Sequence, residues 1–156
     1  MKWKNATHVR HVIVIIKILS DTKQGALLAI LFHLAFWHMD LSYFGRGLLG
    51  SWPQADASVV LWSLSVCADE WQSPEKLTRL CTIPEPAMFS GTWDRTPYAM
   101  EAKILRPLLW FGLLEHRSEE IPGSRFGQHH FYRKAKLFER LFAFDVHIDR
   151  SEEARH

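Results

Sequence analysis

The nine histidines are the first residues to test for chemistry, because imidazole serves both as a metal ligand and as a general acid or base. His8 and His11 lie three residues apart, and His33 and His38 are followed closely by Asp40. Neither group is accompanied by an HExxH motif, a CxxC motif or a paired-carboxylate arrangement. These histidines are therefore interpreted as core or surface residues, and no metal site is expected.

The adjacent histidines near the C-terminal end and the two cysteines do not form a catalytic centre either. His129 and His130 are adjacent at the start of an expected strand, where neighbouring side chains point to opposite faces, so they cannot easily share a metal ion. Neither Cys67 nor Cys81 has a histidine at a defined spacing, and no GxxxxGK[ST] phosphate loop is present. Gly45, Gly47 and Gly50 are interpreted as part of a loop. We expect no catalytic residues, no cofactor and no enzymatic activity.

Cysteine usage and hydropathy indicate a cytoplasmic protein. Two cysteines in apolar surroundings are too few for a disulfide framework. The basic and apolar N-terminus imitates a signal peptide, but Lys17 interrupts the apolar run and no small-residue cleavage site follows. The apolar stretch from Gly25 to Phe44 contains His33, His38 and Asp40, and its uninterrupted runs are shorter than the about 20 residues of a membrane span. A buried helix explains it better.

Length and charge suggest one domain with an extension. A chain of 156 residues that is 47% hydrophobic can bury a substantial core. The formal net charge is only +2. Residues 55–147 hold eleven Lys and Arg against twelve Asp and Glu, a net of −1, whereas residues 1–54 hold six basic and two acidic side chains. The larger part of the chain therefore lacks the basic footprint of a nucleic-acid-binding domain.

The first third of the chain contains two apolar segments. Val9 to Leu19 is rich in β-branched residues, which favours a strand, but its apolar positions also fit a helical stripe, and we favour a helix because its neighbours are helical. Asp21 and Gln24 have the spacing of a capping box for a helix over residues 22–39. The apolar surface of that helix is broad enough to predict a homodimer through residues 22–39.

Two helices are expected next. Asp56 is a plausible cap for a helix from Ala57 to about Glu70, and Ser73-Pro74 pairs a cap with a first-turn proline for a short second helix. The segment from Thr82 to Arg95 is loop-like.

A third helix and a hairpin follow the loop. Thr96-Pro97 opens a helix over residues 97–111, in which Pro107 predicts a kink and after which Gly112 provides a left-handed cap. Residues 113–117 and 131–135 alternate as two strands around a Gly/Pro loop, and residues 137–144 predict a short amphipathic helix.

The element order from about residue 56 to residue 146 resembles the winged helix-turn-helix superfamily, with a Gly-Leu-Leu exit from the third helix. One departure is the loop of roughly a dozen residues before that helix, where the family turn has only a few. We therefore expect a mostly helical α+β fold. Its parts would be an N-terminal helical extension (1–55), a winged helix-turn-helix domain (56–147) and a polar tail (148–156).

The resemblance implies a small transcriptional regulator that reads duplex DNA. Solvent-facing residues of helix 97–111 would enter the major groove, and the wing, residues 113–135, would lie along the backbone or minor groove. On the helix, Glu101 and Ala102 are also candidates for contact with DNA. The principal DNA-binding candidates on the helix and the wing are Tyr98, Lys103, Arg106, Arg125, Gln128, His129, Arg133 and Lys134.

Two alternatives stay open beside DNA binding. Winged helices also serve as protein–protein interaction modules, for which the same surface needs no basic patch, and the neutral charge balance favours this reading. A third hypothesis is a regulator that senses a small molecule in a pocket lined by Trp62, Phe89 and Trp93. Most tryptophans at helical positions, Trp110 among them, are expected to fill the core or an interface.

Overall fold

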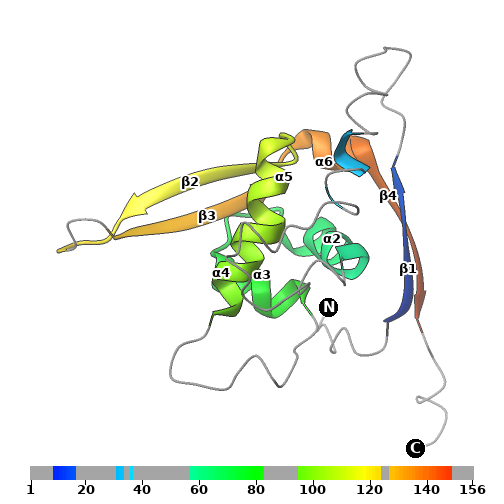
Figure 1. Cartoon of the computed structure of the whole chain (residues 1–156), viewed down its shortest axis with the longest axis horizontal. Helices are drawn as coiled ribbons and strands as arrows, with labels where there is room; N and C mark the ends of the chain where they lie inside the picture. Colours follow the sequence, from blue (N-terminus) through cyan, green and yellow to red (C-terminus); the bar gives the residue numbers. More distant parts are fainter. Residues whose placement is uncertain are drawn as a thin grey trace, which may run out of the picture.

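Helices and antiparallel strands both build this protein, and helix is the commoner of the two (Figure 1). The computed structural model describes residues 9–16, 31–33, 36, 57–82, 95–123 and 127–148. The α+β class predicted from the sequence is confirmed. The elements are β1 (Val9–Ile16), α2 (Ala57–Cys67), α3 (Pro74–Cys81), α4 (Thr96–Met100), η6 (Glu101–Leu105), α5 (Arg106–Trp110), β2 (Leu114–Glu120), β3 (Gln128–Lys134), α6 (Lys136–Leu141) and β4 (Phe142–Ile148).

The start of α3 follows the local signal in the sequence. The Ser73 hydroxyl accepts a hydrogen bond from the Lys76 backbone N–H at 3.3 Å, and Pro74 occupies the first turn. A serine cap satisfies a backbone donor that would otherwise lack an intrahelical partner, and proline removes another. The predicted cap and proline are confirmed. The cap predicted at Asp56 lies outside the described residues.

The expected third helix is present, but its middle is π-helical. Segments α4, η6 and α5 follow one another without a break, and the Arg106 N–H donates to the Glu101 carbonyl, five residues back. Pro107, which lacks an N–H, lies directly after this wider turn. A π-helical turn is one way for a helix to accommodate an interruption of its regular hydrogen bonding. The sequence predicts a kink at Pro107, and the structure shows a change of helix type directly before it.

The predicted exit at Gly112 is confirmed. Gly112 has φ = 69°, and its N–H donates to the Leu109 carbonyl at 2.9 Å. The next N–H, of Leu113, donates to the Leu108 carbonyl at 2.9 Å. Glycine takes this left-handed conformation without the steric penalty of a Cβ atom. The chain therefore turns out of α5 directly into β2.

Strands β2 and β3 form an antiparallel hairpin that projects from the helices (Figure 1). The register pairs Leu114 with Lys134 and Glu120 with Gln128, so both strands run past the bounds expected from the sequence. A single bridge from the α2–α3 connection joins the outer edge of β3, since Gln72 and Tyr132 exchange backbone hydrogen bonds of 3.0 and 2.9 Å. The hairpin is therefore attached to the connection between α2 and α3.

A second antiparallel ribbon contradicts the sequence analysis. The segment from Val9, for which we favoured a helix, is strand β1, and it pairs with β4. Strand β4 begins at Phe142, within the region assigned to a terminal helix, so the helix α6 is shorter than predicted. Among the described residues each strand pairs with the other and not with a neighbouring segment, so this long-range pairing satisfies backbone groups along both strands. The ribbon lies across the helices from the β2–β3 hairpin (Figure 1).

The core contains an aromatic cluster that links both ends of the chain. The Phe32 ring is 5.2 Å from the rings of Phe111 and Phe142, and Phe36 stacks on it at 5.0 Å. Of the helix predicted over residues 22–39, the structure describes residues 31–33, which are helical, and residue 36; the rest lies outside the described residues. Phe32 and Phe36 are buried within this chain, so neither adds to an exposed dimerisation face. No described helix is long and apolar enough to cross a membrane.

Candidate binding surface on the β2–β3 hairpin

A buried tyrosine attaches the hairpin to the long helix. Tyr132 of β3 is 1% exposed, and its hydroxyl donates to Glu101 Oε1 at 2.7 Å. Arg106 Nη2 lies 3.6 Å from the same oxygen. Burial and the hydrogen-bonded carboxylate raise the pKa of Tyr132, so the phenol stays protonated and remains a donor. The contact fixes the hairpin's base against η6.

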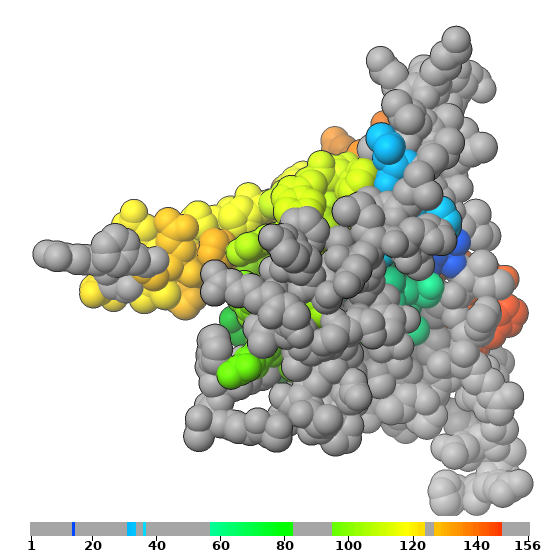
Figure 2. Space-filling view, viewed as in Figure 1, coloured from blue at the N-terminus to red at the C-terminus, as the bar shows by residue number. Residues whose placement is uncertain are grey.

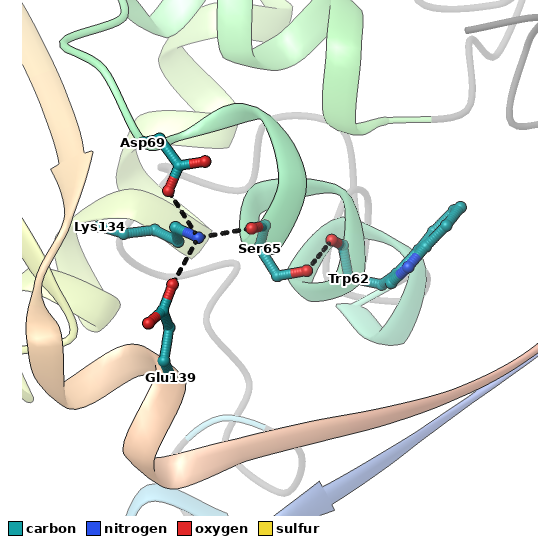
Figure 3. Close-up of polar contacts among 5 residues, drawn as sticks. All are labelled: Trp62, Ser65, Asp69, Lys134 and Glu139. Atoms are coloured by element: carbon teal, nitrogen blue, oxygen red, sulfur yellow. Dashed lines mark hydrogen bonds and ion pairs between the residues drawn. The ribbon is translucent and has the colours of Figure 1, made fainter. Parts of the chain in front are cut away.

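A lysine holds the other side of the hairpin base (Figure 3). Lys134 Nζ donates to the Ser65 carbonyl at 2.5 Å and forms ion pairs with Asp69 at 2.9 Å and Glu139 at 3.1 Å. Burial of the ammonium acts to lower the pKa of Lys134, but its hydrogen bonds to the two carboxylates outweigh burial. The pKa of Lys134 is therefore raised. Ser65 is itself held, because its hydroxyl donates to the Trp62 carbonyl at 2.5 Å. Three elements, α2, β3 and α6, therefore meet at one cation.

This position corrects the prediction for Lys134. Its side chain is only 7% exposed and already has three acceptors, so it neither contacts a phosphate nor lies free in solvent. The neighbouring Arg133 points to the opposite face of the strand and stays 39% exposed. Two adjacent basic residues that look equivalent in the sequence thus have different roles.

The helix candidates are mostly buried, which contradicts the sequence analysis. Lys103 is 0% exposed, and Ala102 and Glu101 are 2% and 9% exposed. Every residue from 99 to 105 is buried, so all faces of nearly two helical turns are covered. A side chain that solvent cannot reach cannot read the edge of a base. The predictions that Lys103, Glu101 and Ala102 face solvent are therefore wrong.

Two helix candidates and one tryptophan keep some exposure. Tyr98 is half-buried, and the Arg106 side chain is 47% exposed beside Glu101. Trp110, expected in the core or an interface, is 59% exposed. The accessible part of this helix is thus limited mainly to Arg106 and Trp110, which share a face of α5, and part of Tyr98 at the start, with the buried residues 99–105 between them.

The hairpin has one face that combines arginine with aromatic rings. The guanidinium of Arg117 lies 4.9 Å from the Trp71 ring and 5.2 Å from the Phe131 ring, and that of Arg133 lies 4.6 Å from Trp71. Arg117 and Phe131 are cross-strand partners, and Arg133 is two residues further along β3. We call Trp71, Arg117, Phe131 and Arg133 the Arg–aromatic face. Cation–π contacts hold its side chains in place before any ligand arrives.

Acidic partners neutralise this face. Arg133 forms a hydrogen-bonded ion pair with its cross-strand partner Glu115, and Arg117 forms one with Glu119 at 3.2 Å. The four side chains are 39–54% exposed, so the pairs lie in solvent and contribute little to stability. Their main effect is on the charge of this face, because the two positive charges are each matched by a negative one.

The opposite face of the hairpin carries a histidine pair. His116 Nε2 and His130 Nδ1 are 2.9 Å apart, and the two rings stack at 5.1 Å. The His116 ring also lies 5.0 Å from the Tyr132 ring. Partial burial and the neighbouring His130 lower the pKa of His116, so its imidazole is neutral at pH 7.

The remaining wing candidates lie towards the tip. Gln128 and His129 are both exposed and adjacent in β3, so they point to opposite faces of the hairpin. Arg125 lies outside the described residues. The structure therefore does not gather the wing candidates on one face: Arg133 and His129 share the face of Phe131, whereas Gln128 lies on the face of the histidine pair.

Sequence analysis missed most of the Arg–aromatic face. It expected most tryptophans at helical positions to fill the core or an interface, and it did not select Trp71, Arg117 or Phe131 as site residues. Alternation along the two strands could have placed Arg117 and Phe131 on one face, once the register was known. Nothing local could have brought Trp71 to them, because it arrives through the Gln72 bridge from a separate element.

Comparisons with known proteins add no assignment. No family model, no curated protein and no solved structure matches the chain. Within the part of the chain that the structure describes, no group of three or more histidine, cysteine or acidic side chains is placed to hold a metal ion.

Proposed function

We propose that this chain is a winged helix-turn-helix protein that acts as a protein–protein interaction module and binds its partner through the Arg–aromatic face of the hairpin. The order α2, α3, long helix and hairpin supports the fold, as does the Gln72 bridge that adds a short third strand to the wing. The fold alone does not decide the function, because winged helices host both DNA-binding and protein-binding proteins.

The burial of the third helix is the observation that carries the proposal. A winged helix that reads DNA inserts an exposed face of this helix into the major groove. Here residues 99–105 are covered, and Lys103 lies among the most buried side chains. The hairpin, by contrast, projects from the body with its strands accessible (Figure 2). Binding is therefore assigned to the wing.

The chemistry of the Arg–aromatic face favours a protein partner over a polyanion. Tryptophan and arginine are enriched at the residues that carry most of the binding energy in protein interfaces. The side chains here are already held by mutual contacts, which lowers the entropy lost on binding. Glu115 and Glu119 lie beside the two arginines and would repel DNA phosphates, whereas a protein can match both charges.

Site-specific photo-crosslinking followed by reconstitution tests this proposal. A photoreactive amino acid at Glu119, next to the Arg–aromatic face, should capture a partner in extracts, and the same probe at the exposed Arg79 of α3 should not. The captured protein would then be purified and titrated against the wild-type chain. We expect Arg117→Ala to weaken that binding at least about tenfold, as loss of a central interface arginine does, and Arg79→Ala to leave it unchanged. Equal affinities of the two variants would reject the assignment.

Duplex DNA binding by the wing is the second candidate. It is favoured by the exposure of the two hairpin guanidiniums, Arg117 and Arg133, whose side chains remain 47% and 39% accessible. Fluorescence anisotropy with a mixed-sequence duplex tests it. If the wing binds DNA, the affinity rises steeply at low salt. The slope of log affinity against log salt concentration should then decrease in magnitude by about one when Arg117 is replaced. Absence of binding at low ionic strength excludes this candidate.

A further inference from the structure

Two cysteine sulfurs lie in contact at the C-terminal ends of neighbouring helices. Cys67 is the last residue of α2 and Cys81 the last residue of α3, and their Sγ atoms are 3.2 Å apart. Both are free thiols. A disulfide requires the sulfurs to approach to about 2.05 Å, so a movement of about 1 Å, within reach of small side-chain rotations, would join them.

The two thiols differ in their access to solvent. Cys67 is half-buried, whereas Cys81 is 0% exposed in the hydrophobic core. A small oxidant can therefore reach Cys67, while Cys81 can react only with a group that is already beside it. This is the arrangement of an attacking thiol and a resolving thiol.

The surroundings also make Cys67 the more reactive sulfur. The hydrogen bond from the Cys81 thiol lowers the pKa of Cys67, with a smaller contribution from the nearby Lys134 ammonium, although burial opposes both. The same hydrogen bond, together with burial, raises the pKa of Cys81. The thiolate is the nucleophilic form of cysteine, so reactivity is concentrated at the accessible residue.

We propose that Cys67 and Cys81 form a reversible redox pair that is oxidised by a hydroperoxide. The Cys67 thiolate attacks the peroxide oxygen, breaking the O–O bond; the sulfur becomes a sulfenic acid, and the leaving oxygen takes a proton as water or an alcohol. The Cys81 sulfur then attacks the Cys67 sulfur, its proton leaves with the hydroxide as water, and the disulfide forms. The protein loses two electrons and two protons, which the peroxide accepts.

Oxidation would act on the connection that supports the hairpin. The segment between the two cysteines contains Trp71 and Gln72, and the Ala68 carbonyl, adjacent to Cys67, accepts the Lys134 backbone N–H at 2.7 Å. A bond between the ends of α2 and α3 closes this segment into a ring. The inference rests on the thiol geometry alone and stands whether or not the hairpin binds a protein.

Peptide mapping of the oxidised wild-type chain is the primary test. The purified protein would be treated with hydrogen peroxide, alkylated without reduction and digested with trypsin. Because Lys76 and Arg79 lie between the two cysteines, the residues fall in separate peptides that only a disulfide holds together. We expect this linked pair, released by dithiothreitol. Oxidation confined to methionine or tryptophan, or cysteines that both remain free to alkylate, would overturn the proposal.

Two variants separate the roles of the thiols. Cys81→Ala should leave Cys67 trapped as a sulfenic acid that reacts with dimedone, and Cys67→Ser should slow thiol oxidation at least about tenfold because the buried Cys81 lacks access. Dimedone labelling at Cys81 of the Cys67→Ser variant, or thiol oxidation of that variant at the wild-type rate, contradicts the assignment. Should either variant misfold, alkylation rates of the two thiols in the native wild-type chain provide the same comparison, with Cys67 expected to react first.

Discussion

The two β-ribbons of this protein differ in what surrounds them. Ribbon β1–β4 joins distant parts of the chain, and its Phe142 is 3% exposed within the aromatic core. Hairpin β2–β3 is formed by neighbouring segments, and every β2 side chain from His116 to Glu120 is exposed. The first ribbon packs Phe142 into the aromatic core with Val14 and Phe144 partly buried against it, whereas the second buries only Leu114 and Tyr132 at its base and extends away from them. Similar secondary structure therefore serves the core in one case and presents a surface in the other.

Replacing one phenylalanine in each ribbon gives the largest expected contrast. Phe142→Ala should lower the free energy of unfolding by about 3–5 kcal/mol, because the ring packs 4.9 Å from Phe138 and 5.2 Å from Phe32. Phe131→Ala, on the half-buried hairpin surface, should cost less than about 1 kcal/mol. Urea denaturation measures both. Similar losses would remove the distinction between a core ribbon and a surface hairpin.

Tyr132→Phe tests the polar attachment of the hairpin to the helix. Removing the hydroxyl deprives the buried Glu101 carboxylate of its 2.7 Å donor, and leaving such a group short of a partner costs about 1–3 kcal/mol. The same denaturation experiment measures the loss, and hydrogen exchange should show faster opening of β2 and β3 than of β1 and β4. Uniform acceleration in both ribbons would mean that Tyr132 supports the whole core instead.

Two adjacent cations on β3 provide a matched pair. Lys134→Ala should destabilise the protein by about 1–2 kcal/mol, because its ammonium is nearly buried and joins α2 to α6. Arg133→Ala should cost less than about 1 kcal/mol, since its ion pair with Glu115 lies in solvent. Thermal unfolding of the two variants decides between them, and a larger effect at Arg133 would reverse the assigned roles.

The smallest effect is a pH dependence of the hairpin. The pKa of His116 is lowered by partial burial and by His130, with Arg106 acting in the same direction and Glu101 opposing. The unfolded chain therefore binds the proton more readily, and stability decreases as the pH falls from about 6.5 through the lower native pKa. The loss should stay below about 1 kcal/mol because the ring is exposed. His116→Gln should flatten this part of the stability profile; an unchanged profile would exclude His116 as its source.

Local signals predicted the elements whose causes are local. The cap at Ser73, the proline at position 74 and the left-handed Gly112 each act within one helical turn, so the backbone there follows from the residues themselves. The hairpin after Gly112 was predicted for the same reason, since its two strands are neighbours in the sequence. The longer strand bounds were not predicted, because pairing rather than composition sets where a strand ends.

Residue environments were predicted less well. Lys103 fits an exposed helix position by its type, but its burial depends on what packs over residues 99–105. Lys134 looks like a surface cation until Asp69 and Glu139 from two other elements meet it. The β1–β4 pairing depends on the two ends of the chain meeting, a contact that no sequence window contains.

The amino-acid order alone determined the class of fold, the Ser73 cap, the glycine exit and the existence of the β2–β3 hairpin, because each depends on backbone preferences and short-range hydrogen bonds. The cap that the sequence suggests at Thr96 does not form, since Thr96 is already the first residue of α4 and no described side chain caps that helix. Tertiary structure decided which charges face solvent, which strand partners β1, and that Trp71 lies under two arginines. Burial and long-range pairing are properties of the assembled chain, and the proposal that the β2–β3 hairpin rather than the helix over residues 96–110 binds a partner rests on them.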